Sequence, residues 1–337
     1  RALLMDRLEQ ILARSVRSKE PAAIFFMNLD RFREINEGQG HAAGDYVLQE
    51  VTQRFSAVID PGMLLARFGG DEFVLVRENT DQAAADFIAD RLAQCLLTPI
   101  SVAEQSLTVG TSIGVSLFPA DGAGADELIR HAVIAMHRAK AASRAHLFFR
   151  SDMSMEIARR TQVAARLARA LAGSDLQLYF QPQFELSSGR LTGAEALLRW
   201  HDSEWGWVSP GEFIPLAESR GLIIPLGEWV IKEACRHVQA WLEAGFTPPR
   251  ISVNVSALQL SDRGFVEKVR STCEKARLSP VMFEIELTES GAMQDPEQSS
   301  RVLLSLREAG FRLAIDDFGV AYSSLVYLKR FSAHKLK

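Results

Sequence analysis

Two adjacent acids follow a pair of glycines within residues 66–76, "ARFGGDEFVLV". Gly69 and Gly70 separate two short apolar runs, which is typical of a hairpin with a two-residue turn, because both turn positions need a positive φ. Asp71 and Glu72 come directly after this turn. Acids beside a turn commonly just face water, but carboxylates held on a rigid turn also suit Mg²⁺. The stretch alone leaves both interpretations open.

A second group of oxygen-bearing side chains lies in the second half of the chain. Glu195, Asn254, Glu286 and the pair Asp316 and Asp317 interrupt four successive apolar runs, near the expected carboxyl ends of strands. Strands often end in polar residues because a loop begins there, but here each strand supplies a hard oxygen ligand. In a barrel of alternating strands and helices, that rim is where active sites form. The pattern predicts a metal site.

The elements that must position the first acid pair follow from hydrophobic periodicity. Strands are expected at 22–30, 63–68, 72–76 and 106–118, and helices at 44–59, 81–96 and 125–143. This order, β-α-β-β-α-β-α, is close to the split βαβ pattern of ferredoxin-like folds. In such a fold the polar end of the first strand and the glycine turn converge on one edge of the sheet.

The second half begins with a predicted helical connector, residues 151–174, whose four arginines are expected to be solvated. Beyond it, strands are expected at 176–184, 192–200, 250–257, 282–290 and 312–319, and helices at 226–245, 264–277 and 295–310. Repeated strand–helix units predict a parallel sheet, either open or closed into a barrel.

The composition excludes several classes of protein. With 337 residues, 47% of them hydrophobic, the chain is long enough for two globular domains. A net charge of −4 argues against a nucleic-acid polymer as partner. The three cysteines are far apart in sequence and form no CxxC, so neither a disulfide framework nor a zinc site is indicated, and a reducing cytoplasm fits. No apolar stretch reaches the roughly 18 residues of a membrane span, so no membrane contact is expected.

The stretches "NLDRFREINEGQGHAAGDYVL", "RFGGDEF" and "HRAKAASR" resemble the GGDEF domain of diguanylate cyclases over residues 1–150. The resemblance implies a nucleotidyl-cyclase palm with a ferredoxin-like core. It also implies an enzyme that joins two GTP molecules into cyclic di-GMP at a two-metal site shared between two protomers, and therefore a homodimer.

The site residues implied by this resemblance include a metal ligand, Asp71, with Glu72 beside it on the Gly69–Gly70 turn. Further implied contacts are to guanine, from Asn36 and Asp45, and to phosphate, from Lys140 and Arg144.

This chain departs from the GGDEF pattern at several of its positions. Asn28 stands where the family has its first metal-binding Asp, and an amide oxygen cannot offset the charge of a divalent ion. Arg33 replaces a usual Lys, Val133 a usual Asp, His137 a usual Tyr and Ser143 a usual Gly, and an inhibitory RxxD is missing at 60–63. The resemblance therefore implies a degenerate cyclase domain that holds GTP as a regulatory module.

The stretches "YFQPQ", "GAEALLRW", "SVNVS", "EIELTES" and "IDDFG" resemble the EAL phosphodiesterase domain over residues 170–337. That family is a TIM-type (β/α)8 barrel that opens cyclic di-GMP to pGpG with two divalent ions, Mg²⁺ or Mn²⁺. The implied ligands are Glu195, Asn254, Glu286, Asp316, which bridges both ions, and Asp317, on the second. The implied substrate contacts are Gln181 and Arg199, and the implied catalytic residues are Glu195, Asp317 and Lys337.

The sequence also departs from the EAL pattern. Val320 and Ala321 replace a usual Thr-Gly, and a later Glu that completes the second metal site is not in the chain. We therefore expect a piece of a longer polypeptide, itself inactive, with a GGDEF domain at 1–150, a connector at 151–174 and the first two-thirds of an EAL barrel at 175–337.

The leading hypothesis is a cytoplasmic cyclic di-GMP phosphodiesterase regulated by GTP, as the cytoplasmic part of a longer sensor. An active diguanylate cyclase and a non-catalytic receptor of cyclic di-GMP or GTP are the alternatives.

Overall fold

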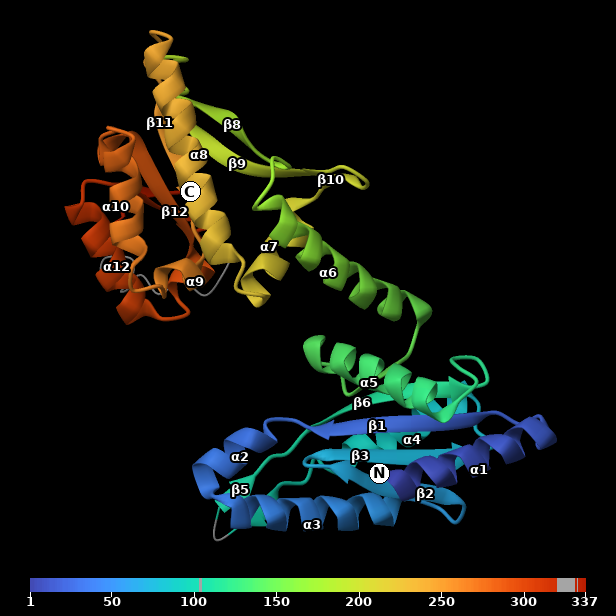
Figure 1. Cartoon of the computed structure of the whole chain (residues 1–337). Coiled ribbons are helices and arrows are strands. Elements are labelled where there is room, and N and C mark those ends of the chain that lie inside the picture. The colour runs from blue at the N-terminus through green and yellow to red at the C-terminus, as the bar shows by residue number, and fades with distance from the viewer. Residues whose placement is uncertain (103–104, 320–330, 332) are drawn as a thin grey trace. The chain divides into compact units, whose positions relative to one another are not determined.

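The computed structural model describes residues 1–102, 105–319, 331 and 333–337. Val320 and Ala321 therefore lie outside the described residues. The chain divides into two compact units, Arg1–Ala158 and Arg159–Lys337, coloured blue to green and green to red in Figure 1. None of the described helices is both long and apolar enough to cross a membrane.

The first unit is built on a five-stranded sheet in the order β2-β3-β1-β6-β7. Its strands are β1 (Ala22–Leu29), β2 (Met63–Gly69), β3 (Glu72–Glu78), β6 (Thr111–Phe118) and β7 (His146–Phe148). The helices are α1 (Ala2–Ser18), α2 (Phe32–Gln39), α3 (His41–Val58), α4 (Gln82–Gln94) and α5 (Ala125–Ala141). The central strand β1 pairs antiparallel with both β3 and β6. This arrangement confirms the predicted ferredoxin-like order.

Alternate residues of β1 enter two separate cores, because successive side chains of a strand point to opposite faces. Phe25 and Met27 pack with Phe55 of α3 on one face. Ile24 and Phe26 pack with residues of α1 and α5 on the other. Continuous apolar sequence in β1 therefore reflects a sheet covered by helices on both faces.

The strand predicted at 106–118 is wrong in part, because it is two strands. β5 (Gln105–Leu107) pairs with β4 (Ile100–Val102) in a separate small sheet. The strand is interrupted at Gly110, whose carbonyl accepts a 2.9 Å hydrogen bond from the Asp30 N–H. A Cβ at Gly110 would lie 2.9 Å from Asp30 Oδ2, so the loop passes too close to Asp30 for a side chain.

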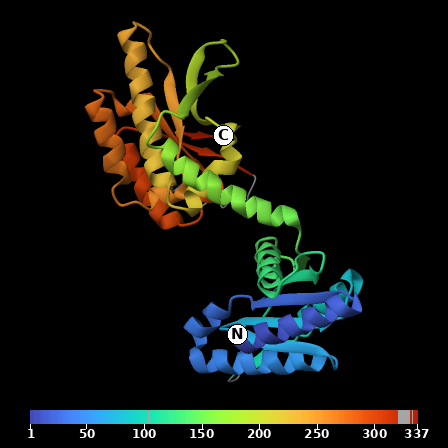
Figure 2. The ribbon, with the colours of Figure 1, turned by 45° about the vertical axis from the view of Figure 1, so that its right-hand side comes forward.

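The helix α6 (Ser151–Ala170) runs unbroken across the boundary between the units (Figure 2). Its arginines were expected to be solvated, and for two of them this is wrong. The guanidinium carbons of Arg159 and Arg166 lie 3.8 and 4.2 Å from the ring centroid of Trp205. Arg166 also donates a 2.8 Å hydrogen bond to the buried Asp202. A charge run gives no sign of such partners, which come from a distant strand and its loop.

The second unit is a seven-stranded sheet in which β10-β9-β11-β12-β13-β14 are successive neighbours and β8 also pairs with β9. The strands are β8 (Leu176–Phe184), β9 (Leu191–Asp202), β10 (Gly206–Val208), β11 (Arg250–Asn254), β12 (Phe283–Thr288), β13 (Arg312–Asp316) and β14 (Lys335–Leu336). The helices are α7 (Pro210–Ser219), α8 (Ile223–Glu243), α9 (Ala257–Leu260), α10 (Phe265–Lys275), α11 (Glu289–Ala292) and α12 (Pro296–Glu308), with a 3₁₀ turn at Pro280–Met282.

Strands β9, β11, β12, β13 and β14 are parallel, as predicted for an EAL-type sheet. The first two predicted strands of this half, β8 and β9, form an antiparallel hairpin, so the parallel order begins at β9. The segment 185–190 between them is too short for the crossover that a parallel pair requires. Gly189, with a φ of 66°, makes the turn.

Candidate active site

The strand register places the predicted metal ligands of the second unit on neighbouring strands. Asn254 at the end of β11 is opposite Glu286 of β12, and Asp316 at the end of β13 is opposite Thr288. Glu195 was expected near the carboxyl end of its strand, and this is wrong. It is opposite Ser252, and β9 continues to Asp202 because its last residues pair with β10.

Four of the predicted residues are brought into contact. The Asn254 Nδ2 donates a 2.8 Å hydrogen bond to Glu195 Oε1. The Lys337 Nζ lies 3.8 Å from Glu195 Oε2 and forms an ion pair with Glu286 Oε1. The backbone N–H of Lys337 donates to Ile315 O at 2.9 Å, which fixes this residue beside β13. One ammonium therefore sits between two carboxylates that the sequence separates widely.

Glu286 is the most buried member of this cluster, with no exposed surface. Burial raises the pKa of its carboxyl group, and the Lys337 ammonium opposes that rise. Neither carboxylate oxygen has a hydrogen bond of normal geometry among the described residues. A buried carboxylate with unused lone pairs is costly unless a cation is held against it, so the ion pair with Lys337 keeps this charge in place.

Asp316 and Asp317 lie where the chain leaves β13. Asp317 has a φ of 56°, in the left-handed region, and its N–H donates a 3.0 Å hydrogen bond to Asp316 Oδ1. The next N–H, of Phe318, donates to Lys337 O at 3.0 Å. In the described part of the chain, no three His, Cys, Asp or Glu side chains are gathered closely enough to form a metal site. Lys337 is therefore held by backbone bonds to Ile315 and Phe318, the residues that flank Asp316 and Asp317.

A cavity of about 520 Å³ adjoins the cluster and shares Asn254 with it. Arg199 of β9 lines this cavity, and its Nη1 donates a 2.9 Å hydrogen bond to Leu198 O. Gln181 is exposed on β8, opposite Glu195. Six further polar residues of the wall had no predicted role; they are Glu218, Ser256, Gln259, Thr288, Ser290 and Gln294.

Two of the nucleotide-site residues predicted in the first unit, Glu72 and Lys140, lie beside Asn28 at the end of β1. Asn28 is opposite Glu72 in the β1–β3 pairing, and the carbonyl of Asp71 accepts a 3.1 Å hydrogen bond from the Leu29 N–H. The Lys140 Nζ donates a 2.7 Å hydrogen bond to Asn28 Oδ1. The amide that replaces a metal-binding Asp is therefore already used by the lysine predicted to bind phosphate.

The turn lies one residue later than predicted, because β2 ends at Gly69, opposite Glu72, and Gly70 and Asp71 are the two turn residues. Gly70 has a φ of 52°, in the left-handed region, and its carbonyl accepts a 2.9 Å hydrogen bond from Arg67 Nε. Gly69 precedes it at a break in the β2–β3 register. The hydrogen bond from Arg67 to Gly70 holds the turn that contains Asp71 in one conformation.

The predicted guanine contacts lie on two consecutive helices. A Cβ on Gly44 would stand 2.0 Å from Asn36 Oδ1, so the Asn36 amide packs directly on the backbone of α3. Asp45, the next residue, is exposed. Among the described contacts, none joins Asn36 or Asp45 to Asn28.

One departure from the GGDEF pattern lies at the end of α5. Ser143, where the family usually has Gly, has a φ of 51°. The following residue, Arg144, donates its N–H to Ala139 O at 2.9 Å, closing the helix with an αL cap. Glycine adopts this conformation with less strain than serine.

Two protein families match the chain. The family described as "EAL domain" matches residues 164–337, and that described as "Diguanylate cyclase, GGDEF domain" matches residues 1–146. The chain belongs to the tandem GGDEF–EAL family. The resemblance inferred from the sequence motifs is thereby confirmed.

Curated relatives span the whole chain. It is 40% identical over its full length to a Pseudomonas aeruginosa protein named bifunctional diguanylate cyclase/cyclic di-GMP phosphodiesterase MucR, and covers 49% of that protein. It is 37% identical over 94% of its length to the cyclic di-GMP phosphodiesterase NbdA of the same organism, of which it covers 40%. The chain therefore spans half or less of these relatives.

Solved structures are similar to it as well. One of them is described as the PaMucR phosphodiesterase in complex with c-di-GMP and is 44% identical in sequence. The match covers 52% of this chain and 71% of the chain in that structure, with a TM-score of 0.50. The match to the Vibrio cholerae LapD S helix–GGDEF–EAL structure covers 100% of this chain and 78% of the chain in that structure, with a TM-score of 0.54. At 17% identity, that second likeness shows the fold alone.

Proposed function

We propose that the protein to which this chain belongs hydrolyses cyclic di-GMP to linear pGpG with its EAL domain. The observation that carries the proposal is the cluster of Glu195, Asn254, Glu286 and Lys337, in which the fully buried Glu286 carboxylate has the Lys337 ammonium as its counter-ion. The names of the relatives, a bifunctional enzyme and a phosphodiesterase, support this substrate.

The donor atoms of this cluster fit divalent metal ions. Carboxylate and amide oxygens are the hard ligands that Mg²⁺ and Mn²⁺ prefer. The residues that would hold two such ions are Glu195, Asn254, Glu286, Asp316 and Asp317. When bound, the ions lower the pKa of a coordinated water and neutralise developing negative charge on the phosphate.

The remaining residues of the site bind and orient the substrate. Arg199 has its guanidinium fixed by Leu198 O at the cavity wall, where it can hold the phosphate that does not react. A cavity of about 520 Å³ is within the size range of nucleotide sites. Lys337, between two carboxylates, can orient the attacking water. The water oxygen adds to phosphorus, the bond from phosphorus to O3′ breaks, and O3′ takes up a proton.

We expect the purified protein to release pGpG from cyclic di-GMP when Mg²⁺ or Mn²⁺ is present and to stop when EDTA is added. Separation of the nucleotides by ion-exchange chromatography gives the rate directly. Tight binding of cyclic di-GMP without pGpG release in either metal would contradict the proposal and favour a receptor.

We infer that the GGDEF domain is a GTP-binding regulatory module with little cyclase activity. Asn28 offers only a neutral oxygen to a metal ion, and that oxygen already accepts a hydrogen bond from Lys140. We further propose that the protein acts as a homodimer, because GGDEF sites are shared between two protomers, and that it works in the cytoplasm.

Replacing Asn28 by Asp should raise the rate of cyclic di-GMP synthesis from GTP on the order of tenfold, because a carboxylate restores a charged metal ligand. The measurement is conversion of GTP in the presence of Mg²⁺, with Glu195→Gln added in all variants to prevent hydrolysis of the product. Asn28→Ala serves as the matched control and should show no gain. Equal synthesis by wild type and Asn28→Asp would overturn the inference.

A further inference from the structure

Two cysteines that are far apart in sequence meet in the core of the second unit. The Sγ atoms of Cys235 on α8 and Cys273 on α10 lie 3.9 Å apart, although 38 positions separate the residues. Cys235 is 2% exposed and Cys273 is fully buried. Both are free thiols. The spacing of cysteines in the sequence gave no sign of this pair, because packing of the two helices creates it.

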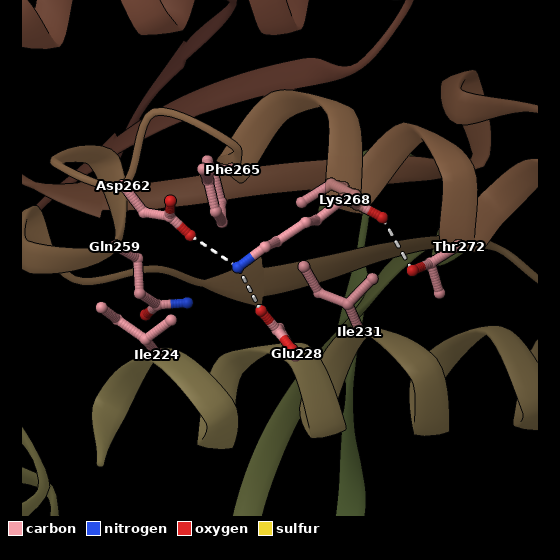
Figure 3. Close-up of a pocket in the computed structure, with 9 residues that line it drawn as sticks. Ile224, Glu228, Ile231, Gln259, Asp262, Phe265, Lys268 and Thr272 are labelled. Atoms are coloured by element: carbon pink, nitrogen blue, oxygen red, sulfur yellow. Dashed lines mark hydrogen bonds and ion pairs between the residues drawn. The ribbon is translucent and has the colours of Figure 1, made fainter. Parts of the chain in front are cut away.

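A second contact holds the same two helices together. The Lys268 Nζ of α10 lies 2.7 Å from Glu228 Oε1 of α8 and 2.8 Å from Asp262 Oδ2, as Figure 3 shows. Ile231 and Phe265 point into the space between the helices beside this ion pair (Figure 3). The approach of the two sulfur atoms is therefore set by an interface with several contacts along its length.

A groove along α8 and α10 leads to the cysteine pair. Its volume is about 660 Å³, and Cys235 lines it. Four cationic side chains and two acids also line it; they are Lys232, Arg236, Lys268, Lys275, Glu228 and Glu233. Because Cys235 itself is only 2% exposed, a protein or a bulky thiol is excluded from its sulfur, and an oxidant that reaches the pair through this groove must be small.

The hydrogen bond between the two sulfur atoms favours ionisation of one of them. The hydrogen bond with Cys235 lowers the pKa of the Cys273 thiol, and the same bond together with burial raises that of Cys235. The thiolate is the reactive form of cysteine. A thiolate with a second thiol in contact is the arrangement in which oxidation ends as a disulfide.

We propose that Cys235 and Cys273 are a redox-active dithiol, which a small hydroperoxide such as hydrogen peroxide converts to a disulfide joining α8 to α10. One sulfur attacks a peroxide oxygen, the O–O bond breaks, and a sulfenic acid and water form. The second sulfur then attacks the sulfenic sulfur, the S–O bond breaks, and the released hydroxide takes the remaining thiol proton. Two thiols and one peroxide give one disulfide and two waters. The sulfur atoms close from 3.9 Å to about 2 Å.

The test is hydrogen peroxide treatment of the reduced, purified protein, followed by thiol counting after denaturation and by peptide mapping with mass spectrometry. The chain's three cysteines include both members of the pair, so the thiol count should fall by two. A cross-linked peptide pair containing Cys235 and Cys273 should appear within single chains, and dithiothreitol should reverse the change.

Cys95 provides the matched control, because it is the third thiol and lies in the other unit. Cys95→Ser should still lose two thiols, whereas Cys235→Ser and Cys273→Ser should each form no intrachain disulfide. Should a serine variant fail to fold, the peptide map of the wild type decides alone. The proposal is overturned if Cys95 is the thiol consumed, if the cross-links join different chains, or if Cys235 and Cys273 stay reduced while the unfolded protein is oxidised.

Discussion

Glu195→Gln is expected to lower the rate of cyclic di-GMP hydrolysis by roughly a hundredfold or more, because the change removes a charged metal ligand and leaves the shape of the site intact. The Gln oxygen can still accept the 2.8 Å hydrogen bond from Asn254 Nδ2. What is lost is the negative charge that faces Lys337 Nζ at 3.8 Å. The measurement is the initial rate of pGpG release, alongside thermal unfolding to show that the variant is folded.

A matched control is available on the same hairpin. Glu185→Gln makes the same chemical change at an exposed acid, which contacts only its neighbours Ser188 and Arg190 among the described side chains. Its hydrolysis rate should stay within about twofold of wild type. A Glu195→Gln enzyme that keeps most of its activity, or a Glu185→Gln enzyme that loses as much, would remove Glu195 from the proposed metal site.

The sequence predicted which residues of the second unit form the cluster better than it predicted where they lie on their strands. Asn254 and Glu286 are directly opposite each other on parallel strands, as strand ends in a parallel sheet allow. Glu195 was misplaced because β9 runs beyond the rim to pair with β10. That extension depends on three residues after a turn, Gly206–Val208, which carry little periodicity of their own.

The sequence did not predict which side chains from distant segments contact one another. Lys140 stands at a predicted phosphate-binding position and Asn28 where the family has a metal-binding Asp, yet they share a 2.7 Å hydrogen bond across 112 positions. The arginines of α6 were interpreted as a solvated run, whereas two of them contact the ring of Trp205. In each case the partner is chosen by tertiary packing, which local pattern does not encode.

These contacts suggest a common feature of the two sites. In each unit a lysine ammonium contacts the oxygens that the family resemblance assigns to a divalent cation: Lys140 on Asn28, and Lys337 on Glu286. An ammonium offsets the charge of a buried carboxylate, so the EAL cluster can persist without a metal ion. A divalent cation at Glu286 would take over that role and leave Lys337 free to act on the substrate.

Lys337→Met should therefore affect both stability and activity. Methionine keeps an unbranched side chain but leaves the buried Glu286 carboxylate without its counter-ion. In EDTA we expect the free energy of unfolding to fall by about 3 kcal/mol, the order of loss for breaking a buried ion pair. Burial already raises the pKa of Glu286, and loss of the ammonium raises it further. A protonated Glu286 has no charge to bury, so the deficit should shrink as the pH is lowered.

Adding Mg²⁺ or Mn²⁺ separates the structural role of Lys337 from its catalytic one. Bound cations should restore most of the lost stability, because they replace the ammonium at Glu286, but hydrolysis should remain roughly a hundredfold or more below wild type, since no group then orients the water. Lys335→Met is the control, because the Lys335 Nζ lies 3.8 Å from Oε1 of Glu284, a buried carboxylate outside the proposed metal site, and donates to Gln183 Oε1 at 3.2 Å. It should stay within a few-fold of the wild-type rate. If metal ions restored activity together with stability, Lys337 would serve only as the counter-ion of Glu286 in the absence of metal and would have no catalytic role.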